Sequence, residues 1–265
     1  MTRGFSDPKQ SKAEPDWDAI ALTLADGELP AGWQLVDSSG FARVAHHPDH
    51  ALFFKLFLPR SPAENLKAAV RGSRATRARR HNDDLRRAGI EAPQNIAWGK
   101  LSKNREYLIS TAVPGSGVDL WLRQKLPRGE DGHSRQRHAL MHQLGVFIGR
   151  MHHSGFVHGD LRTGNVLADW RGGRFRFALI DNERNSRHDM PPGKLLLKNL
   201  MQLNMHVPSE LSLWERGRFF AAWRRQMREL SDTEARLLAA EAYRWAMKRL
   251  SAKGKLDEPE NGESL

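Results

Sequence analysis

One short segment constrains the fold of this 265-residue chain more than any other. It runs from His158 to Asn165 (HGDLRTGN) and is followed by two apolar runs, at 166–168 and 177–180, and then by Asp181. Residues 169–174 between the two runs are polar and contain a Gly-Gly pair, which is typical of a hairpin turn. The pattern therefore predicts that Asp160, Asn165 and Asp181 meet at one end of a short hairpin.

Phosphoryl transfer needs these three residue types in this order. It uses a carboxylate next to the attacking hydroxyl, a carboxamide oxygen for a metal ion, and a second carboxylate between metal and phosphates. Asp160 is the candidate catalytic residue, which accepts the proton of the acceptor hydroxyl. Asn165 and Asp181 are candidate ligands of Mg²⁺, with ATP as the donor. His158 is expected to brace the loop. The segment is typical of a kinase catalytic loop.

A small sheet is predicted upstream of this loop. Residues 33–36 and 51–57 have the composition of strands, and turns are predicted at 37–40 and 47–50. Lys55 lies near the middle of the second strand, where kinases place the lysine that holds the α- and β-phosphates of ATP. The turn that contains Ser38, Ser39 and Gly40 is expected to cover the phosphates, although one glycine is a weaker signal than a Gly-rich loop.

The remaining elements predict an α+β, bilobal, protein-kinase-like fold, with a small N-terminal antiparallel sheet plus helix and a larger, mostly helical C-terminal lobe. A helix at 63–88, closed by Gly89, and a strand at 107–111 complete the first lobe. Residues 112–115 form the expected hinge, whose backbone would contact adenine. Helices are predicted at 134–153, 195–204, 214–230 and 233–250. The expected boundaries are a flexible leader at 1–17, lobes at 18–112 and 113–253, and an acidic disordered tail at 254–265.

The net charge of +11 implies an acidic partner, which can be nucleic acid, an anionic membrane surface or a phosphorylated substrate. Part of the excess lies in an arginine block, for which a phosphate- or lipid-binding surface and a solvated helix face are equal alternatives. The block contains Arg71, Arg74, Arg77, Arg79, Arg80, Arg86 and Arg87. The chain has no cysteine, which excludes disulfides and thiolate chemistry. The polar N-terminus and the lack of a long apolar run predict a soluble, unsecreted protein.

Histidines cluster before the catalytic loop. His138 and His142 have the i, i+4 spacing of a metal site, but no third ligand accompanies them. Surface or packing roles are therefore expected.

The order of these parts resembles the bacterial lipopolysaccharide core kinases, the Kdo and heptose kinase family. The resemblance covers about residues 53–222. It depends on Lys55, residues 85–93, the catalytic loop, residues 179–181, and the later segments 198–204 and 218–223. It implies ATP-dependent phosphorylation of a sugar hydroxyl in the lipopolysaccharide core or a lipid A precursor. The implied location is cytoplasmic, with peripheral contact to the anionic face of the inner membrane.

Two departures from the family pattern are visible. The helix glutamate that pairs with the lysine falls near Ala78, and Asp83, Asp84 or Glu64 are possible substitutes. Loss of that pair weakens phosphate positioning and makes a non-catalytic role an alternative. The metal segment reads Asp181-Asn182-Glu183 in place of Asp-Phe-Gly, a difference expected to change little.

Four functions remain open at this point. The leading one is a lipopolysaccharide core kinase, and the second is a protein or aminoglycoside kinase with the same loop. The third is a kinase-like module that binds nucleotide or lipid without turnover. Nucleic-acid binding is last, and no nucleic acid is expected as a partner, because no nucleic-acid fold accompanies the charge.

Overall fold

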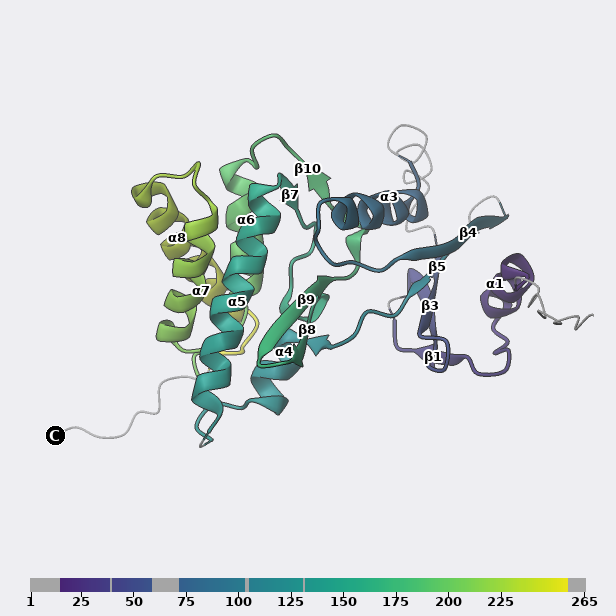
Figure 1. The fold of residues 1–265 in the computed structure, drawn as a ribbon, viewed down its shortest axis with the longest axis horizontal. Coiled ribbons are helices and arrows are strands. Elements are labelled where there is room, and N and C mark those ends of the chain that lie inside the picture. The colour runs from purple at the N-terminus through teal and green to yellow at the C-terminus, as the bar shows by residue number, and fades with distance from the viewer. Residues whose placement is uncertain (1–14, 39, 59–71, 103–104, 131, 257–265) are drawn as a thin grey trace, which may run out of the picture.

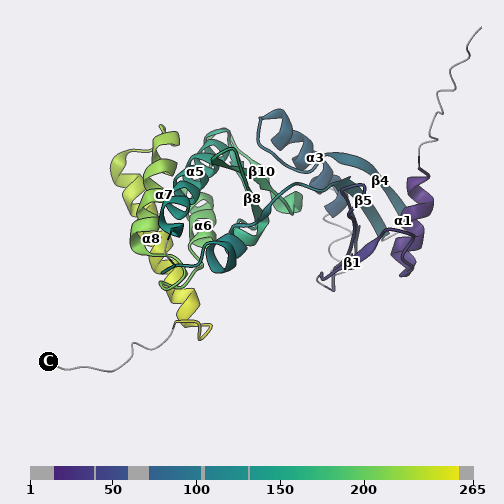
Figure 2. The same ribbon diagram turned by 60° about the horizontal axis from the view of Figure 1, so that its bottom comes forward.

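The computed structural model describes residues 15–38, 40–58, 72–102, 105–130 and 132–256. These residues form two lobes, which are separated clearly in both ribbon views (Figures 1 and 2). The smaller lobe holds a five-stranded antiparallel sheet with the spatial order β1-β2-β3-β5-β4. Its strands are β1 (Gln34–Val36), β2 (Ala42–His47), β3 (Leu52–Phe57), β4 (Asn95–Ser102) and β5 (Arg105–Thr111). Strands β2 and β4 were not predicted from the sequence.

The two faces of the small sheet have different roles. Leu52, Phe54 and Leu56 of β3 are buried on one face, and helix α1 (Trp17–Asp26) packs against that face. Because successive side chains of a strand alternate between faces, Lys55 lies on the opposite face. Sequence reasoning did not predict α1, and the expected leader at 1–17 ends one residue inside it.

Helix α3 (Arg74–Arg87) lies on the side of the small sheet that faces the larger lobe (Figures 1 and 2). The predicted helix at 63–88 is interrupted at Gly72 and Ser73, which are not helical. Ser73 is the N-cap, with extended backbone angles and a side chain that accepts a hydrogen bond from the Thr76 N–H. Residues 63–71 of the prediction lie outside the described residues. The predicted end is correct, since Gly89 has the left-handed φ of +73° that closes a helix.

The larger lobe is mostly helical. Its long helices are α5 (His133–His153), α6 (Gly193–Leu203), α7 (Leu213–Gln226) and α8 (Asp232–Ser251), close to the four predicted ranges. Helices α5 and α7 approach closely at Gly145, where an added Cβ would lie 2.3 Å from the carbonyl oxygen of Phe219. Trp223 of α7 is fully buried in the same core. The predicted bilobal α+β fold is confirmed.

The smaller elements of the larger lobe surround the loop at 158–165. They are β6 (Ser116–Gly117), α4 (Val118–Leu120), a π-helical turn η1 (Trp121–Lys125), β7 (Phe156–Val157), β8 (Val166–Arg171), β9 (Arg174–Leu179) and β10 (Ser186–Arg187), together with the 3₁₀ turns η2 (Thr163–Asn165) and η3 (Asn182–Arg184). The predicted hairpin is present as β8 and β9. Its strands are longer than expected, because only Gly172 and Gly173 form the turn, both with positive φ.

In the described ranges, no helix is both long and apolar enough to cross a membrane. In the same ranges, no group of three or more His, Asp or Glu is placed to hold a metal ion, and His138 and His142 belong to no such group.

Candidate active site between the lobes

A cavity of about 920 Å³ lies between the two lobes. One wall of the cavity comes from the face of the small sheet that carries Lys55. The wall on the side of the larger lobe includes Leu167 and Ile180 of the hairpin region. The predicted hinge residues Ala112–Gly115 also line it. Most of the lining is apolar, while Lys55, Asn165 and Asp181 place charged and polar groups at one part of it. This combination suits a ligand with a flat apolar ring and a charged tail.

The catalytic loop, residues 158–165, is held by a buried histidine. His158 Nδ1 accepts a hydrogen bond of 3.0 Å from the Asp160 N–H, so the proton of the neutral ring is on Nε2, which donates to the carbonyl of Ile180 at 3.0 Å. Burial lowers the pKa of His158 despite these hydrogen bonds and the nearby Asp181 and Asp160. The ring is therefore neutral and braces the loop, as its sequence position suggested.

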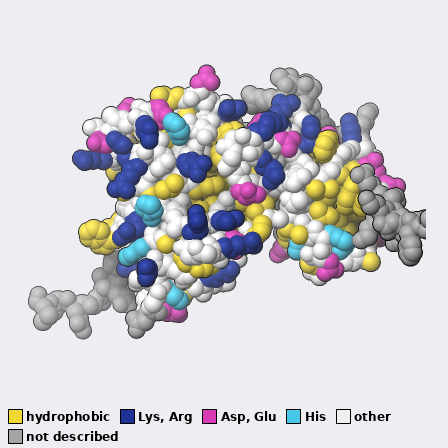
Figure 3. All heavy atoms as spheres, in the orientation of Figure 1, with side chains coloured by type: hydrophobic (Ala, Val, Ile, Leu, Met, Phe, Trp, Pro, Cys, Tyr) yellow, Lys and Arg dark blue, Asp and Glu magenta, His cyan; other side chains and the backbone are white. Residues whose placement is uncertain are grey.

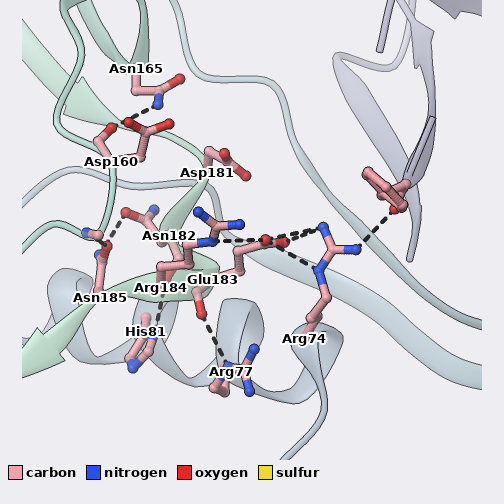
Figure 4. A network of polar contacts seen from close by, with 12 residues as sticks. Arg74, Arg77, His81, Asp160, Asn165, Asp181, Asn182, Glu183, Arg184 and Asn185 are labelled. Atoms are coloured by element: carbon pink, nitrogen blue, oxygen red, sulfur yellow. Dashed lines mark hydrogen bonds and ion pairs between the residues drawn. The ribbon is translucent and has the colours of Figure 1, made fainter. Parts of the chain in front are cut away.

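The carboxylate of Asp160 is oriented by its neighbours. Its Oδ1 accepts hydrogen bonds of 2.9 Å from Gln202 Nε2 of α6 and from Arg162 Nε. Its backbone carbonyl accepts a bond of 2.8 Å from Asn165 Nδ2. Since the Asn165 amide nitrogen is used in this bond, Oδ1 is the atom of that residue that can ligate a metal ion. Figure 4 shows Asp160, Asn165 and Asp181 grouped together.

Asp181 lies at the end of the hairpin in an unusual backbone conformation. Its φ of +59° and ψ of +46° are left-handed, which is uncommon for a residue other than glycine and is often found at functional sites. Its Oδ1 is 2.6 Å from Lys55 Nζ across the cavity. Burial disfavours the charged carboxylate, but the positive charges of Lys55 and Arg74 outweigh that effect, and the pKa of Asp181 lies below its ordinary value. The carboxylate is ionised at neutral pH.

A second carboxylate, Glu183, lies next to this pair. Its Oε2 is 3.7 Å from Lys55 Nζ, and its side chain is only 4% exposed. Arg74 of α3 holds it in a two-pronged contact, in which Nη2 donates to both carboxylate oxygens at 3.0 Å and Nε donates to Oε1 at 3.2 Å. Glu183 is therefore a charged neighbour of the lysine that the sequence pattern did not indicate.

The proposed substitutes for the missing helix glutamate lie elsewhere. Ala78 lines the cavity. Asp83 Oδ1 accepts a hydrogen bond from Asn95, and Asp84 pairs with Arg87 on the helix surface. Glu64 lies outside the described residues. The carboxylates that contact Lys55 in the described residues come from the larger lobe.

The arginine block does not form one surface. Arg74 is buried and bound to Glu183, and Arg77 donates to the Glu183 backbone carbonyl. Arg79 lies over the Trp98 ring, and Arg86 donates to the Ala92 carbonyl. Arg71 lies outside the described residues. Arg74 and Arg77 thus attach α3 to the segment after Asp181, which neither interpretation included, while Arg80, Arg86 and Arg87 are exposed, as expected of a solvated helix face. Figure 3 shows Lys and Arg side chains spread over the larger lobe as well as the smaller one.

The predicted phosphate-covering turn is only partly placed at the cavity. Ser38 lines it and donates to the Ala42 carbonyl at 2.9 Å. Gly40 is exposed, and Ser39 lies outside the described residues.

Sequence reasoning missed Glu183, Arg74 and Gln202 as parts of the site. The arginine and the glutamate are 109 positions apart, so no local pattern connects them. Gln202 lies in the segment 198–204 that carried the family resemblance, which was a usable signal for its importance.

A sheet lobe with an inward-facing lysine, a helical lobe with the catalytic loop, and a cavity between them define a kinase-like phosphotransferase fold. The model of the lipopolysaccharide kinase (Kdo/WaaP) family matches residues 63–223, more than half of the chain. The chain therefore belongs to this family, as its sequence pattern predicted. Membership makes it a kinase, and kinases use ATP.

Solved structures agree with this fold. The chain is similar to WaaP in complex with acyl carrier protein, with 19% identity and a TM-score of 0.59 over 81% of this chain and 88% of that one. It is also similar to WbdD, with 18% identity and a TM-score of 0.51 over 88% of this chain but only 47% of WbdD. At these identities the likeness shows the fold alone. The comparison with curated proteins found no match.

Proposed function

We propose that this chain transfers the γ-phosphate of ATP to a sugar hydroxyl of the lipopolysaccharide core, either Kdo or heptose. One observation carries the proposal. Lys55, Asn165 and Asp181 line one cavity, and Asp160 is hydrogen-bonded to Asn165. These are the four groups that a kinase needs for phosphate binding, metal binding and activation of the acceptor hydroxyl.

Each group has a proposed task. Asp160 orients the acceptor hydroxyl and accepts its proton, with Gln202 and Arg162 holding the carboxylate. The Lys55 ammonium binds phosphate oxygens as a point charge. Asn165 Oδ1 and the Asp181 carboxylate fit Mg²⁺, because both are hard oxygen ligands and the pKa of Asp181 keeps it ionised. When bound, the ion would neutralise charge on the phosphates.

The apolar part of the cavity suits the adenine ring. Val44 and Leu108 of the small sheet and Leu167 of the hairpin line it, next to the hinge at Ala112–Gly115. Backbone groups of such a segment can hydrogen-bond the adenine edge. Ser38 and Gly40, with Ser39, stay proposed contacts of the phosphates.

The surface next to Asp160, where the acceptor would bind, carries positive charge. Arg162 is 73% exposed next to Asp160, and Lys198 Nζ lies 3.4 Å from the Gly159 carbonyl oxygen. Such cations favour an anionic acceptor such as a lipopolysaccharide precursor, and they support peripheral contact with the anionic cytoplasmic face of the inner membrane. We further propose the lobe boundaries 18–112 and 113–253, with a leader at 1–17 and an acidic tail at 254–265.

Acceptors of other kinds, such as proteins or aminoglycosides, need the same catalytic loop and stay as alternatives for the test. The non-catalytic alternative was motivated by Ala78. The missing helix glutamate is a weaker argument for a non-catalytic role in this structure, because Lys55 has two other carboxylate neighbours.

The test is phosphate transfer from ATP with Mg²⁺ to purified lipopolysaccharide core, protein and aminoglycoside acceptors, read by mass spectrometry. We expect a phosphate on Kdo or heptose. Asp160→Ala should lower the rate on the order of 10³-fold, within the range for a lost general base, while the melting temperature stays unchanged. Asp169→Asn is the matched control, since the partly buried Asp169 pairs with Arg171 on the same hairpin, away from the lining of the cavity. Equal turnover by Asp160→Ala, or transfer only to another acceptor, would refute the proposal.

A further inference from the structure

The partner of Lys55 comes from an unexpected part of the molecule. In kinases the strand lysine pairs with a glutamate of the neighbouring helix. Here the helix has Ala78 near that position, and the lysine lies between Asp181 at 2.6 Å and Glu183 at 3.7 Å. Both carboxylates belong to the segment that follows the hairpin of the larger lobe.

Glu183 is fixed more firmly than a surface carboxylate. It is almost fully buried, and the guanidinium of Arg74, which is 6% exposed, contacts both of its oxygens. Arg74 Nη1 also donates to the backbone carbonyls of Phe41 at 2.9 Å and Leu58 at 3.1 Å. The arginine is therefore held by the residue before β2 and the residue after β3 of the small sheet, and it contacts the Glu183 carboxylate from there (Figure 4).

One face of α3 binds the same segment. Arg77 Nε donates to the Glu183 carbonyl at 3.2 Å, and His81 Nδ1 lies 2.8 Å from the Asn182 carbonyl oxygen. Asn182 Nδ2 donates to Asn82 Oδ1 at 2.9 Å. Residues 74, 77, 81 and 82 lie on one side of a helix. The helix therefore holds the backbone after Asp181 in place, as well as the Glu183 side chain.

The buried ion pair of this site is Arg74 with Glu183, whose side chains are 6% and 4% exposed, while those of Lys55 and Asp181 are 27% and 39% exposed. Arg184 Nε also lies 3.8 Å from Glu183 Oε1. Charges that leave water need such partners, since an unpaired buried charge is strongly unfavourable. The two departures from the family pattern, Ala78 on the helix and Glu183 after Asp181, thus complement each other.

We propose that Glu183 is the positioning residue for Lys55, and that Arg74 holds it there. The carboxylate that orients the lysine is then carried by the metal-binding segment, and the helix supplies the guanidinium instead of the glutamate. Asp181 is itself a proposed metal ligand. When Asp181 binds the metal ion, Glu183 is the carboxylate that remains as a partner of Lys55. This inference rests on the proposed kinase function.

A purely structural role is the competing explanation. In that case the buried pair of Arg74 and Glu183 only stabilises the fold, and any neutral pair of similar size would replace it. The two explanations differ in nucleotide affinity, because only a positioning role links Glu183 to the placement of the Lys55 ammonium.

The experiment compares three variants of the full chain. Glu183→Gln removes the carboxylate but leaves Arg74 buried without it. Arg74→Met together with Glu183→Gln removes both charges, which restores stability where a buried pair is replaced by neutral side chains of similar volume. Glu215→Gln is the matched control, because Glu215 forms a buried pair with Arg137 in the larger lobe, away from the residues that line the cavity.

Binding of a non-hydrolysable ATP analogue with Mg²⁺ is measured by calorimetry, beside melting temperature, KM and kcat. We expect both Glu183 variants to raise the Kd of the analogue and the KM of ATP at least about tenfold, the effect of losing one charged contact. The double variant should recover melting temperature without recovering affinity. Glu215→Gln should lower the melting temperature and leave the Kd unchanged.

Wild-type affinity in the double variant would overturn the positioning role while leaving the kinase proposal intact. A wild-type protein that binds no ATP analogue would refute the kinase proposal, and this inference with it. The two failures are therefore distinguishable from the wild-type measurement alone.

Discussion

The catalytic loop and the lysine site, defined as Lys55, Arg74, Asp181 and Glu183, are stabilised in different ways. The loop is held from within the larger lobe by two hydrogen bonds, one from His158 to the Ile180 carbonyl and one from Gln202 to the Asp160 carboxylate. The lysine site is held by charged contacts between the lobes, Lys55 with Asp181 and Arg74 with Glu183. The Asp160 carboxylate, the proposed proton acceptor, is therefore oriented by residues of the larger lobe, while the proposed phosphate positioning by Lys55 depends on how the two lobes meet.

The support of the loop continues into the core of the larger lobe. Asn199 of α6 accepts from the His158 N–H and donates to the His158 carbonyl at 2.7 Å. The same side chain contacts His152 of α5, which accepts a hydrogen bond from the indole of Trp223. These are hydrogen bonds between neutral buried groups, and each contributes about 1 kcal/mol to stability. They hold the side chains of the network in one arrangement, because the loss of any one bond would leave a buried polar atom unpaired.

Asp181 belongs to the lysine site and is also a proposed metal ligand together with Asn165 of the loop, so its loss should have the largest effect. Asp181→Asn removes a charge at the proposed metal site and the closest partner of Lys55. We expect kcat to fall on the order of 10³-fold, about 4 kcal/mol of transition-state stabilisation, together with weaker Mg²⁺ dependence. Steady-state kinetics over a Mg²⁺ titration measures this effect. Asp189→Asn, at an exposed position of the same segment, is the control, and a loss within about threefold would contradict the assignment.

Acid should destabilise the larger lobe through His152. Complete burial lowers the pKa of this residue from 6.5 to about 4, despite its contact with Asn199. Since the unfolded chain binds the proton first, this stability is present above pH 6.5 and is lost as the pH falls toward 4. The loss amounts to about 3 kcal/mol of unfolding free energy.

Urea unfolding of the wild type and of His152→Gln at pH 7, 5.5 and 4.5 tests this prediction. His158 and His206 also have pKa values lowered by burial, so both proteins lose some stability, and the difference between them reports His152. His142→Gln, at an exposed position of the same helix, should follow the wild type. Equal pH slopes for the wild type and His152→Gln would refute the role of His152.

A smaller effect is expected from Gln202, which belongs to the catalytic loop's support alone. Gln202→Ala removes the hydrogen bonds to Asp160 Oδ1 and to the Leu161 N–H. We expect about a tenfold lower kcat, the effect of losing about 1.4 kcal/mol of hydrogen bonding, with an unchanged KM for ATP. Gln143→Ala is a matched control, since that glutamine also accepts from a backbone N–H, at Phe175, but away from the loop. A raised KM for ATP with unchanged kcat would contradict the separation of the two regions.

Local pattern was sufficient to predict the catalytic loop, the hairpin and Lys55. Asp160, Asn165 and Asp181 lie within 22 positions of one another, and the hairpin between them has clear strand and turn residues. Lys55 could be placed because it lies in a strongly apolar strand. The end of α3 could also be predicted, because helices commonly end just before a glycine, and Gly89 has the positive φ of such a position.

The remaining features depend on contacts that sequence spacing does not encode. The pairing of Arg74 with Glu183 joins two lobes, and the arginine looked like one of several surface cations. The start of α3 at Arg74 was not predicted, because Gly72 and Ser73 lie within a segment of otherwise good helix formers. Strands β2 and β4 have mixed polar composition and are stabilised mainly by pairing with β3 and β5.

The most direct test compares Glu183→Gln with Gln202→Ala for two quantities, the Kd of an ATP analogue with Mg²⁺ and the kcat of phosphate transfer to lipopolysaccharide core. The account predicts a clean division. The Glu183 variant should bind the analogue at least about tenfold more weakly, and the Gln202 variant should bind it like the wild type with about a tenfold lower kcat. If both variants change the same quantity by the same factor, the loop and the lysine site are not separately supported, and the account is wrong.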